Sequence, residues 1–326
     1  MKKVAILGTG AYGLSLSLMF LKNHVDILMW TISEEEKKLL EETRKTPKLE
    51  GIEIPKEIKF TNNIKECIED RELIVLAVPA KFADDTLKKI EPFFDKKRQH
   101  ILIASKGIEQ DTCLFIDQIA FKILKTRHIA VISGPTFAID IAHNNPVALA
   151  LGASSIKTRK LVYYYLHNET LKLRHSSDMR GLEICGSIKN VIAIASGILT
   201  GLGYSDSTQA FLITESLHDI KNFIRAYGGK GKTILTFAGF GDLLLTCTSV
   251  KSRNFSFGLL LGKREKKEVI DKYKKETTIE GLYTLDSIYK LIKDKDIEMP
   301  IIDLIYDIVY NGKNPDSLAE FLITKE

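Results

Sequence analysis

Cysteine is scarce and scattered in this chain. The 326 residues include only four cysteines, Cys67, Cys113, Cys185 and Cys247, and no two of them form a CxxC pair. Isolated thiols of this kind are typical of reduced cysteines in a cytosolic protein rather than of a disulfide framework. We therefore expect a cytoplasmic protein, and we expect no metal site.

An excess of one charge is also lacking. The net charge is only +5, and acidic and basic residues alternate, as in the stretch IKDKDIE. This pattern does not favour a nucleic-acid-binding protein. A mild positive field suits a small phosphorylated substrate, although it serves plain solubility equally well. There is no internal repeat or low-complexity tract, and the length allows two domains with substantial cores.

The apolar run near the start of the sequence is interrupted by glycines. The segment from Val4 to Leu21 is nearly apolar, but Gly8, Gly10 and Gly13 divide it into a strand pattern and a helix pattern. We therefore expect neither a targeting segment nor a membrane span.

The same three glycines form a GxGxxG motif. A short apolar strand, Val4–Leu7, precedes the sequence GTGAYG, and a helix pattern follows to about Asn23. In this setting the first glycine permits a tight turn, the second lets a pyrophosphate approach the backbone, and the third lets the helix pack against the strand. The phosphates then lie at the N-terminus of the helix. The motif predicts dinucleotide binding.

The choice between NADH and NADPH is left open. After the second strand, Val25–Trp30, an acid would bind the ribose hydroxyls of NAD, and an arginine would bind the extra phosphate of NADP. The chain has Trp30, Thr31 and Ile32 at this point, followed by Glu34–Glu36 and Lys37–Lys38.

Further apolar runs alternate with helix patterns and predict a doubly wound sheet in residues 1–177. The expected strands are 73–78, 101–104, 129–133, 147–151 and 171–173. Ligands of such sheets bind at the carboxyl ends of the strands, where this chain carries Lys81, Lys106 and the turn GPTF. Either lysine is also compatible with a solvated loop. From residue 178 to 326 the patterns are helical.

One long helix pattern, residues 178–203, is apolar almost all round and therefore predicts a buried helix. It nevertheless contains Glu183, Lys189 and Asn190. A buried lysine requires a partner, a cleft or a chemical task, because desolvating an ammonium is costly. The alternative is that Lys189 extends to the surface at the edge of the core.

A polar stretch follows the turn AGFGD. Asp242 is succeeded by Thr246, Ser252, Arg253 and Asn254. An arginine can donate two parallel hydrogen bonds to a phosphate, and the adjacent polar side chains add donors, so the stretch is a candidate phosphate clamp. The sequence GGKGKT at 228–233 is not a P-loop, because Ala226 replaces its first glycine and a helix precedes it.

Taken in order, these motifs resemble the NAD(P)-dependent glycerol-3-phosphate dehydrogenases over essentially the whole chain. GTGAYG, VPAKF, SKGIE, GPTFAIDIA, EICGSIKNVIAIASGI, GFGDLLLTC, SRNFSFG and IEG follow the order and approximate spacing of that family. The resemblance implies an N-terminal Rossmann domain, 1–177, and an all-α domain like that of 6-phosphogluconate dehydrogenase, 178–326. It also implies a cytoplasmic homodimer that supplies sn-glycerol 3-phosphate for phospholipid synthesis.

The resemblance also assigns roles to individual residues. Lys189 matches the catalytic lysine, with Asp242 beside it. The implied substrate-binding residues are Lys106, Asn190, Thr246, Ser252, Arg253 and Asn254. The implied cofactor-binding residues are Gly8, Gly10, Ala11, Tyr12, Gly13, Trp30, Pro79, Phe82, Lys106, Ala138, Arg253 and Glu280.

Several positions depart from the family pattern. Ser207, Gln209 and Glu215 stand where the family usually has Asn, Lys and Arg, and the arginine usual after the second strand is absent. Two alternatives therefore remain. One is a related two-domain reductase of another small phosphorylated or carboxylated ketone, and the other is a catalytically silent nucleotide-binding homologue.

Overall fold

The computed structural model describes residues 2–324 and divides the chain into two compact units. The first unit comprises residues 1–105 and 115–179, and the second comprises residues 106–114 and 180–326. The short segment 106–114 thus packs with the helical part of the chain, although the residues on both sides of it in the sequence belong to the first unit.

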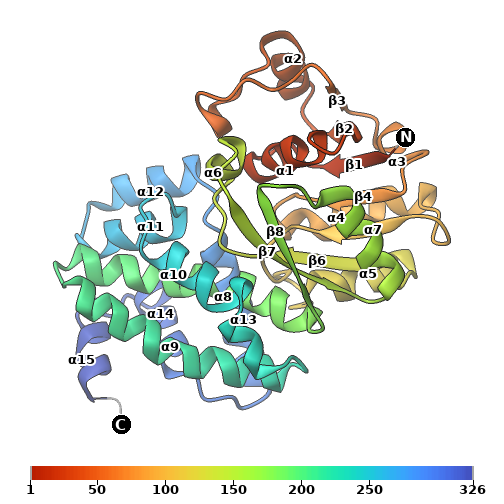
Figure 1. Ribbon diagram of the computed structural model, residues 1–326. Helices are drawn as coiled ribbons and strands as arrows, with labels where there is room; N and C mark the ends of the chain where they lie inside the picture. The colour runs from red at the N-terminus through yellow and green to blue at the C-terminus, as the bar shows by residue number, and fades with distance from the viewer. Residues whose placement is uncertain (1, 325–326) are drawn as a thin grey trace. The chain divides into compact units, whose positions relative to one another are not determined.

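The first unit is built on an eight-stranded sheet with the order β3-β2-β1-β4-β5-β6-β7-β8 (Figure 1). All neighbouring strands are parallel except β6 and β7, which are antiparallel. The strands are β1 (Lys3–Leu7), β2 (Asp26–Trp30), β3 (Ile58–Thr61), β4 (Leu73–Leu76), β5 (His100–Ile103), β6 (Ile129–Ser133), β7 (Val147–Ala153) and β8 (Leu171–Ser176). The predicted Rossmann-type sheet is confirmed, with β3 added and with β7 and β8 running opposite to the other strands.

Helices connect these strands, as the alternating patterns predict. They are α1 (Ala11–Leu21), α2 (Glu34–Thr43), α3 (Ile64–Ile68), α4 (Ala83–Ile90), α5 (Ile116–Leu124), α6 (Ala138–Ala142) and α7 (Ile156–Leu166). Strands β1 and β4 to β6 are buried along their whole length or nearly so, because helices cover both faces of a parallel sheet. The strand order reverses between β1 and β4, which is where such sheets bind nucleotides.

The second unit is helical. Its helices are α8 (Met179–Gly201), α9 (Asp206–Ala226), α10 (Asp242–Cys247), α11 (Arg253–Gly262), α12 (Lys267–Glu276), α13 (Glu280–Asp294), α14 (Pro300–Tyr310) and α15 (Ser317–Thr324), drawn in green to blue in Figure 1. By length and composition α8 would be able to cross a membrane, but its most apolar stretch is completely buried in the protein. A core helix of a globular protein passes the same test.

Helices α8 and α11 cross with their backbones in contact. A methyl group placed on Gly258 of α11 would lie 2.0 Å from the carbonyl oxygen of Ile194, and one placed on Gly197 of α8 would lie 2.0 Å from that of Phe255. Gly201 and Gly262 lie in the same crossing. Since only glycine fits at this spacing, the two helices are held close together, and residues carried on α11 have a fixed position relative to those on α8.

Candidate active site

The glycine-rich loop of the first unit has the geometry that a pyrophosphate requires. Gly8 adopts a φ of +116°, which permits the tight turn after β1. A methyl group on Gly13 would lie 2.4 Å from the carbonyl oxygen of Gly8, so this glycine allows α1 to pack against the turn. A methyl group on Gly10 would meet nothing within 4 Å. The open side at Gly10, next to the first residue of α1, fits a ligand phosphate.

Four other predicted cofactor residues also lie in the first unit. The amide of Gly8 donates to the carbonyl oxygen of Trp30, at 2.9 Å. Ser15 of α1 donates to the carbonyl oxygen of Ala138, at 2.7 Å. Pro79 directly precedes the short helical turn Ala80–Phe82, and the Phe82 side chain is about half exposed. Trp30 and Ala138 are therefore close to the glycine-rich loop and its helix.

A buried cluster in the second unit contains Lys189. Its Nζ donates to Asp242 Oδ1 at 2.5 Å and to Thr246 Oγ1 at 3.0 Å. Lys106 Nζ, from segment 106–114, donates to the other carboxylate oxygen of Asp242 at 2.9 Å. Asp242 is 0% exposed and Lys189 is 7% exposed. The structure therefore excludes the surface-directed alternative for Lys189, because one carboxylate holds two lysines inside the protein.

The local backbone directs Asp242 into this cluster. Residues Phe237–Gly241 form one wide π-helical turn immediately before α10, and Asp242 is the first residue of α10. A methyl group on Gly239 would lie 2.1 Å from the carbonyl oxygen of Ile234, so the turn can close only at a glycine. Such π turns inside helical segments are frequent at functional sites.

Burial changes the acidity of the central lysine. It lowers the pKa of Lys189 to about 8, because the ammonium is desolvated; Asp242 raises that pKa, and Lys106 lowers it. A lysine whose pKa lies near neutral pH can both stabilise negative charge and give up a proton. Strongly shifted pKa values of buried groups are concentrated at active sites.

The start of α11 presents donors for an anion. Ser252 is the N-cap residue of α11, and its hydroxyl accepts a hydrogen bond from the amide of Phe255 at 3.3 Å. Arg253 follows as the first helical residue and is exposed. The positive end of a helix together with an exposed guanidinium group suits a phosphate.

Asn190 holds the side chain of Asn254 in position. Asn254 Nδ2 donates to Asn190 Oδ1 at 3.0 Å, and Asn254 Oδ1 accepts from the amide of Gly281 at 2.8 Å. Helices α8, α11 and α13 therefore meet at Asn254. Glu280, the first residue of α13, has a pKa raised by burial, while Arg253, Lys189 and Lys106 lower it. The three cations are thus close enough to Glu280 to act on it electrostatically.

Three of the departures from the family pattern, Ser207, Gln209 and Glu215, lie on α9. Gln209 Nε2 donates to the carbonyl oxygen of Cys247 at 3.1 Å and to Thr200 Oγ1 at 3.3 Å. Gln209 therefore ties α9 to α8 and α10. Ser207 is exposed, and Glu215 is partly buried.

Sequence reasoning gave no role to the polar side chains at the end of β6. Ser133 and Thr136 are 2% and 8% exposed, and within residues 2–324 their hydroxyl groups have no hydrogen-bond partner. Buried hydroxyl groups normally find partners, so this pair marks an unusual site. The available signal was the position of Thr136 in the GPTF turn, after a strand.

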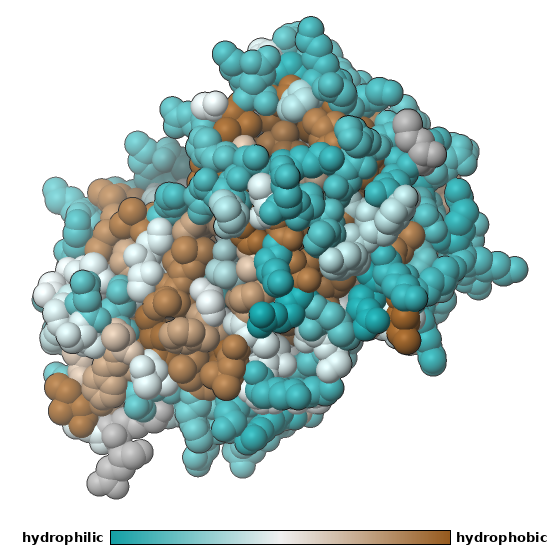
Figure 2. All heavy atoms as spheres, in the orientation of Figure 1, coloured by the Kyte–Doolittle hydropathy of each residue, from teal (hydrophilic) through white to brown (hydrophobic). Residues whose placement is uncertain are grey.

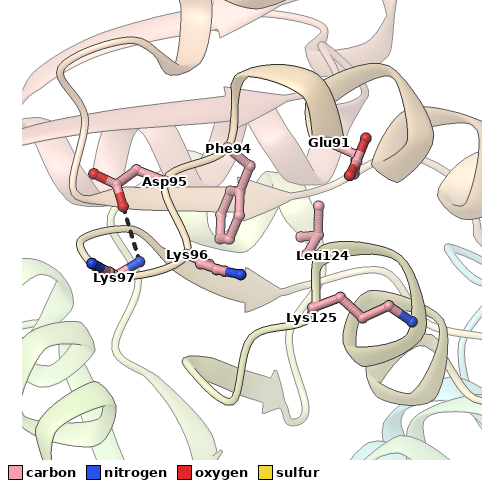
Figure 3. Close-up of a pocket in the computed structure, with 7 residues that line it drawn as sticks. All are labelled: Glu91, Phe94, Asp95, Lys96, Lys97, Leu124 and Lys125. Atoms are coloured by element: carbon pink, nitrogen blue, oxygen red, sulfur yellow. Dashed lines mark hydrogen bonds between the residues drawn. The ribbon is translucent and has the colours of Figure 1, made fainter.

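A separate cavity of about 370 Å³ lies in the first unit (Figure 3). It is lined by Glu91, Phe94, Asp95, Lys96, Lys97, Leu124 and Lys125. None of these was predicted as a site residue, and acids and lysines of the surface line it together. We assign it no role.

A dinucleotide loop on a doubly wound sheet and a buried lysine–aspartate cluster on helices define an NAD(P)-dependent dehydrogenase. Models of the NAD-dependent glycerol-3-phosphate dehydrogenase N-terminus and C-terminus match residues 3–159 and 178–320. The chain belongs to the NAD-dependent glycerol-3-phosphate dehydrogenase family.

Individual members of the family match this chain along its full length. The glycerol-3-phosphate dehydrogenase [NAD(P)+] of Agathobacter rectalis is 35% identical over 100% of this chain and 97% of its own. That of Bacillus subtilis is 33% identical over 100% of this chain and 95% of its own. The crystal structure of the glycerol-3-phosphate dehydrogenase of Coxiella burnetii superimposes with a TM-score of 0.94, at 29% identity and 99% coverage of both chains.

Proposed function

We propose how the two units divide the reaction of the family. The chain is an oxidoreductase that interconverts dihydroxyacetone phosphate and sn-glycerol 3-phosphate with NAD(P)H. In our proposal residues 1–177 form the dinucleotide-binding domain, and residues 178–326 form the substrate-binding domain, to which Lys106 contributes. The product is the backbone of glycerophospholipids, so the enzyme belongs to lipid metabolism.

The cofactor is held, in this proposal, by the residues that the family pattern indicates. The group comprises Gly8, Gly10, Ala11, Tyr12, Gly13, Trp30, Pro79, Phe82, Lys106, Ala138, Arg253 and Glu280. The open side of Gly10 at the start of α1 supports it, since a pyrophosphate needs close access to the backbone there. The cofactor supplies the hydride of the reaction.

Lys189 is the proposed general acid, and its position carries the proposal. Reduction places negative charge on the ketone oxygen, which a fixed ammonium stabilises and then protonates. Lys189 suits both tasks because it is held by Asp242 and Thr246, and because burial lowers its pKa to about 8. Asp242 orients Lys189 and balances its charge, and Lys106 bonds to the same carboxylate from the other side.

The substrate phosphate binds, in our proposal, at the start of α11. Arg253 and Asn254 contact the phosphate, and Ser252 shapes the end of the helix. Asn190 acts by holding Asn254, since its side-chain oxygen accepts from Asn254 at 3.0 Å. Binding energy from the phosphate then aligns the distant ketone with Lys189.

Replacing Arg253 by alanine is expected to raise the KM for dihydroxyacetone phosphate by roughly 10–100-fold, because a charge-assisted pair of hydrogen bonds to the phosphate is lost. Steady-state kinetics at saturating cofactor would measure the change. Dihydroxyacetone without the phosphate is the control substrate: its slow reduction should be the same in both proteins. An unchanged KM for the phosphorylated ketone would contradict the clamp and, with it, the proposed orientation of the substrate.

The rival interpretations are not favoured. Both halves of the family match, the relatives cover the chain from end to end, and Lys189 and Asp242 form an intact buried pair. A silent nucleotide-binding protein would have no need to hold two lysines on one buried carboxylate, since burying charges costs stability.

We also propose that the enzyme is a cytoplasmic homodimer. Figure 2 shows apolar side chains gathered over the area where Figure 1 draws α9 and α10, and Phe211, Phe240 and Leu244 are each 39–41% exposed. Exposed apolar groups that gather on one face favour an interface.

Light scattering on the purified protein should give about twice the monomer mass of 36.7 kDa. Phe211→Lys should shift the mass to that of the monomer, whereas Ile156→Lys, at an apolar residue of α7 that is 64% exposed, should not. A monomeric wild-type protein would refute the dimer.

A further inference from the structure

The end of β2 decides which nicotinamide cofactor a Rossmann-type sheet prefers. The two cofactors differ only by a phosphate on the adenosine ribose, and this group lies near the residues that follow the second strand. Here that position is well defined: β1 and β2 are parallel neighbours with Leu7 opposite Trp30, and the amide of Gly8 donates to the carbonyl oxygen of Trp30. The end of β2, from which residues 31–36 continue, therefore lies beside the glycine-rich loop.

Carboxylates occupy this position. The first turn of α2 consists of Glu34, Glu35 and Glu36. Glu36 Oε2 accepts a hydrogen bond from Thr31 Oγ1 at 2.9 Å, which holds the carboxylate at the end of β2. Ser33 Oγ donates to Glu35 Oε2 at 2.9 Å and accepts from the amide of Glu36 at 3.1 Å. The positive end of α2 is thus already supplied with acceptors.

The cations near the end of β2 do not turn the negative charge of this region into a positive one. Lys37 is paired with Glu34 at 3.8 Å, and Lys48 forms an ion pair with Glu36. Lys89 Nζ lies 5.7 Å from the centre of the Trp30 ring, on the side chain that closes β2. There is no arginine between residues 31 and 36. A doubly charged phosphate would meet the three glutamates of the first turn of α2, two of them paired with lysines, and residues 31–36 supply no guanidinium group to bind it.

A second observation indicates that the end of β2 binds a ribose hydroxyl group of the cofactor rather than a phosphate. Asn62 follows β3 and donates through Nδ2 to the carbonyl oxygen of Thr31 at 2.8 Å, which fixes the orientation of its amide. Its Oδ1 is then buried and has no donor among residues 2–324. A free acceptor beside Thr31 suits a ribose hydroxyl, which can donate, and repels a phosphate, which cannot.

We propose that this enzyme is specific for NADH, and that Glu36, Ser33 and Asn62 set the preference by offering acceptors where NADPH carries its extra phosphate. The inference narrows the NAD(P)H dependence of the family to one cofactor. It does not depend on the roles proposed for Lys189 or Arg253.

Titration calorimetry with NADH and with NADPH tests the proposal without turnover, and initial rates with dihydroxyacetone phosphate give the ratio of the two kcat/KM values. We expect NADH to bind at least ~10-fold more tightly and to give at least a ~10-fold higher kcat/KM, the order of magnitude for one unfavourable charge pair at a partly exposed site. Equal or tighter binding of NADPH would overturn the proposal, whether or not the enzyme is active.

Two variants test whether the end of β2 sets the preference for NADH over NADPH. Ser33→Arg should raise the ratio of the NADH dissociation constant to the NADPH dissociation constant by ~10-fold or more, because it adds a guanidinium group where the phosphate would lie. Glu36→Gln should raise this ratio by a smaller factor, since it removes one negative charge. Glu42→Gln, on an exposed residue near the far end of α2, is the matched control and should leave the ratio unchanged. An unchanged ratio in Ser33→Arg would show that the end of β2 does not set the preference.

Discussion

Replacing Lys189 by methionine should leave nucleotide binding intact and lower kcat for dihydroxyacetone phosphate by at least ~1,000-fold. General acid catalysis contributes roughly 10²–10⁴-fold, and loss of the ammonium also removes the charge that stabilises the developing oxyanion. Methionine fills a similar volume in this apolar part of α8. Asp242 keeps Lys106 as an ion-pair partner at 2.9 Å, so its carboxylate is not left alone in the core. Nucleotide affinity and single-turnover rates would measure the two effects separately.

The pH dependence provides a second readout of the same residue. The pKa of Lys189 is lowered from 10.5 to about 8, so the ammonium is present below that pH and is lost above it. Ketone reduction should therefore decline as the pH rises through about 8, and glycerol 3-phosphate oxidation should increase over the same range. Lys290→Met, which removes an exposed lysine paired with Asp286 at 2.8 Å, is the matched control and should retain both profiles. A Lys189→Met enzyme with kcat within tenfold of the wild type would exclude Lys189 as the acid.

Replacing Gly258 by alanine should destabilise the helical unit strongly. The new methyl group would lie 2.0 Å from the carbonyl oxygen of Ile194, a backbone atom that cannot move away alone, so α11 must separate from α8. Overpacking of this kind costs about 1–3 kcal/mol or more, which outweighs the gain of roughly 1 kcal/mol from better helix propensity. We expect the melting temperature to fall by roughly 2–8 °C. Thermal unfolding followed by circular dichroism would measure it.

The surviving fraction of Gly258→Ala should also bind substrate poorly. Asn254 is the second residue of α11 and bonds to Asn190 of α8, so separation of the two helices lengthens that bond. Ser207→Thr adds a methyl group to an exposed residue of α9 and serves as the control, with no change in melting temperature or KM. A Gly258→Ala protein that melts like the wild type would mean that the crossing tolerates a side chain, and that glycine is not what sets the helix spacing.

Local patterns in the sequence were enough for much of the fold. The strand–glycine–helix pattern around Gly8 and the apolar runs predicted the sheet, and the apolar helix predicted α8. They did not reveal β3, whose four residues lie in a polar region, or the reversed direction of β7 and β8. Strand direction depends on pairing between distant segments, and a period of two is the same in either direction.

The candidate site was predictable as a list of residues but not as a set of contacts. The lone lysine in an apolar helix indicated that Lys189 needed a partner, a cleft or a chemical task, and the resemblance to the family implied that Asp242 lies beside it. Asp242 also binds Lys106, because segment 106–114 packs with the helical unit. No local pattern in the sequence predicts the path of this segment. The bonds from Asn254 to Asn190 and to Gly281 join residues 64 and 27 positions away along the chain. Such pairings follow from how the helices pack.

The path of segment 106–114 limits how this gene can be divided. A cut at residue 177 looks natural, yet a fragment that starts there would leave Asp242 with one lysine instead of two, because Lys106 is encoded far upstream. Chimaeras that exchange halves between relatives would likewise combine one parent's Lys106 segment with the other parent's helices. A recombination that preserves the buried cluster has to transfer residues 106–114 together with residues 180–326, as two separate insertions.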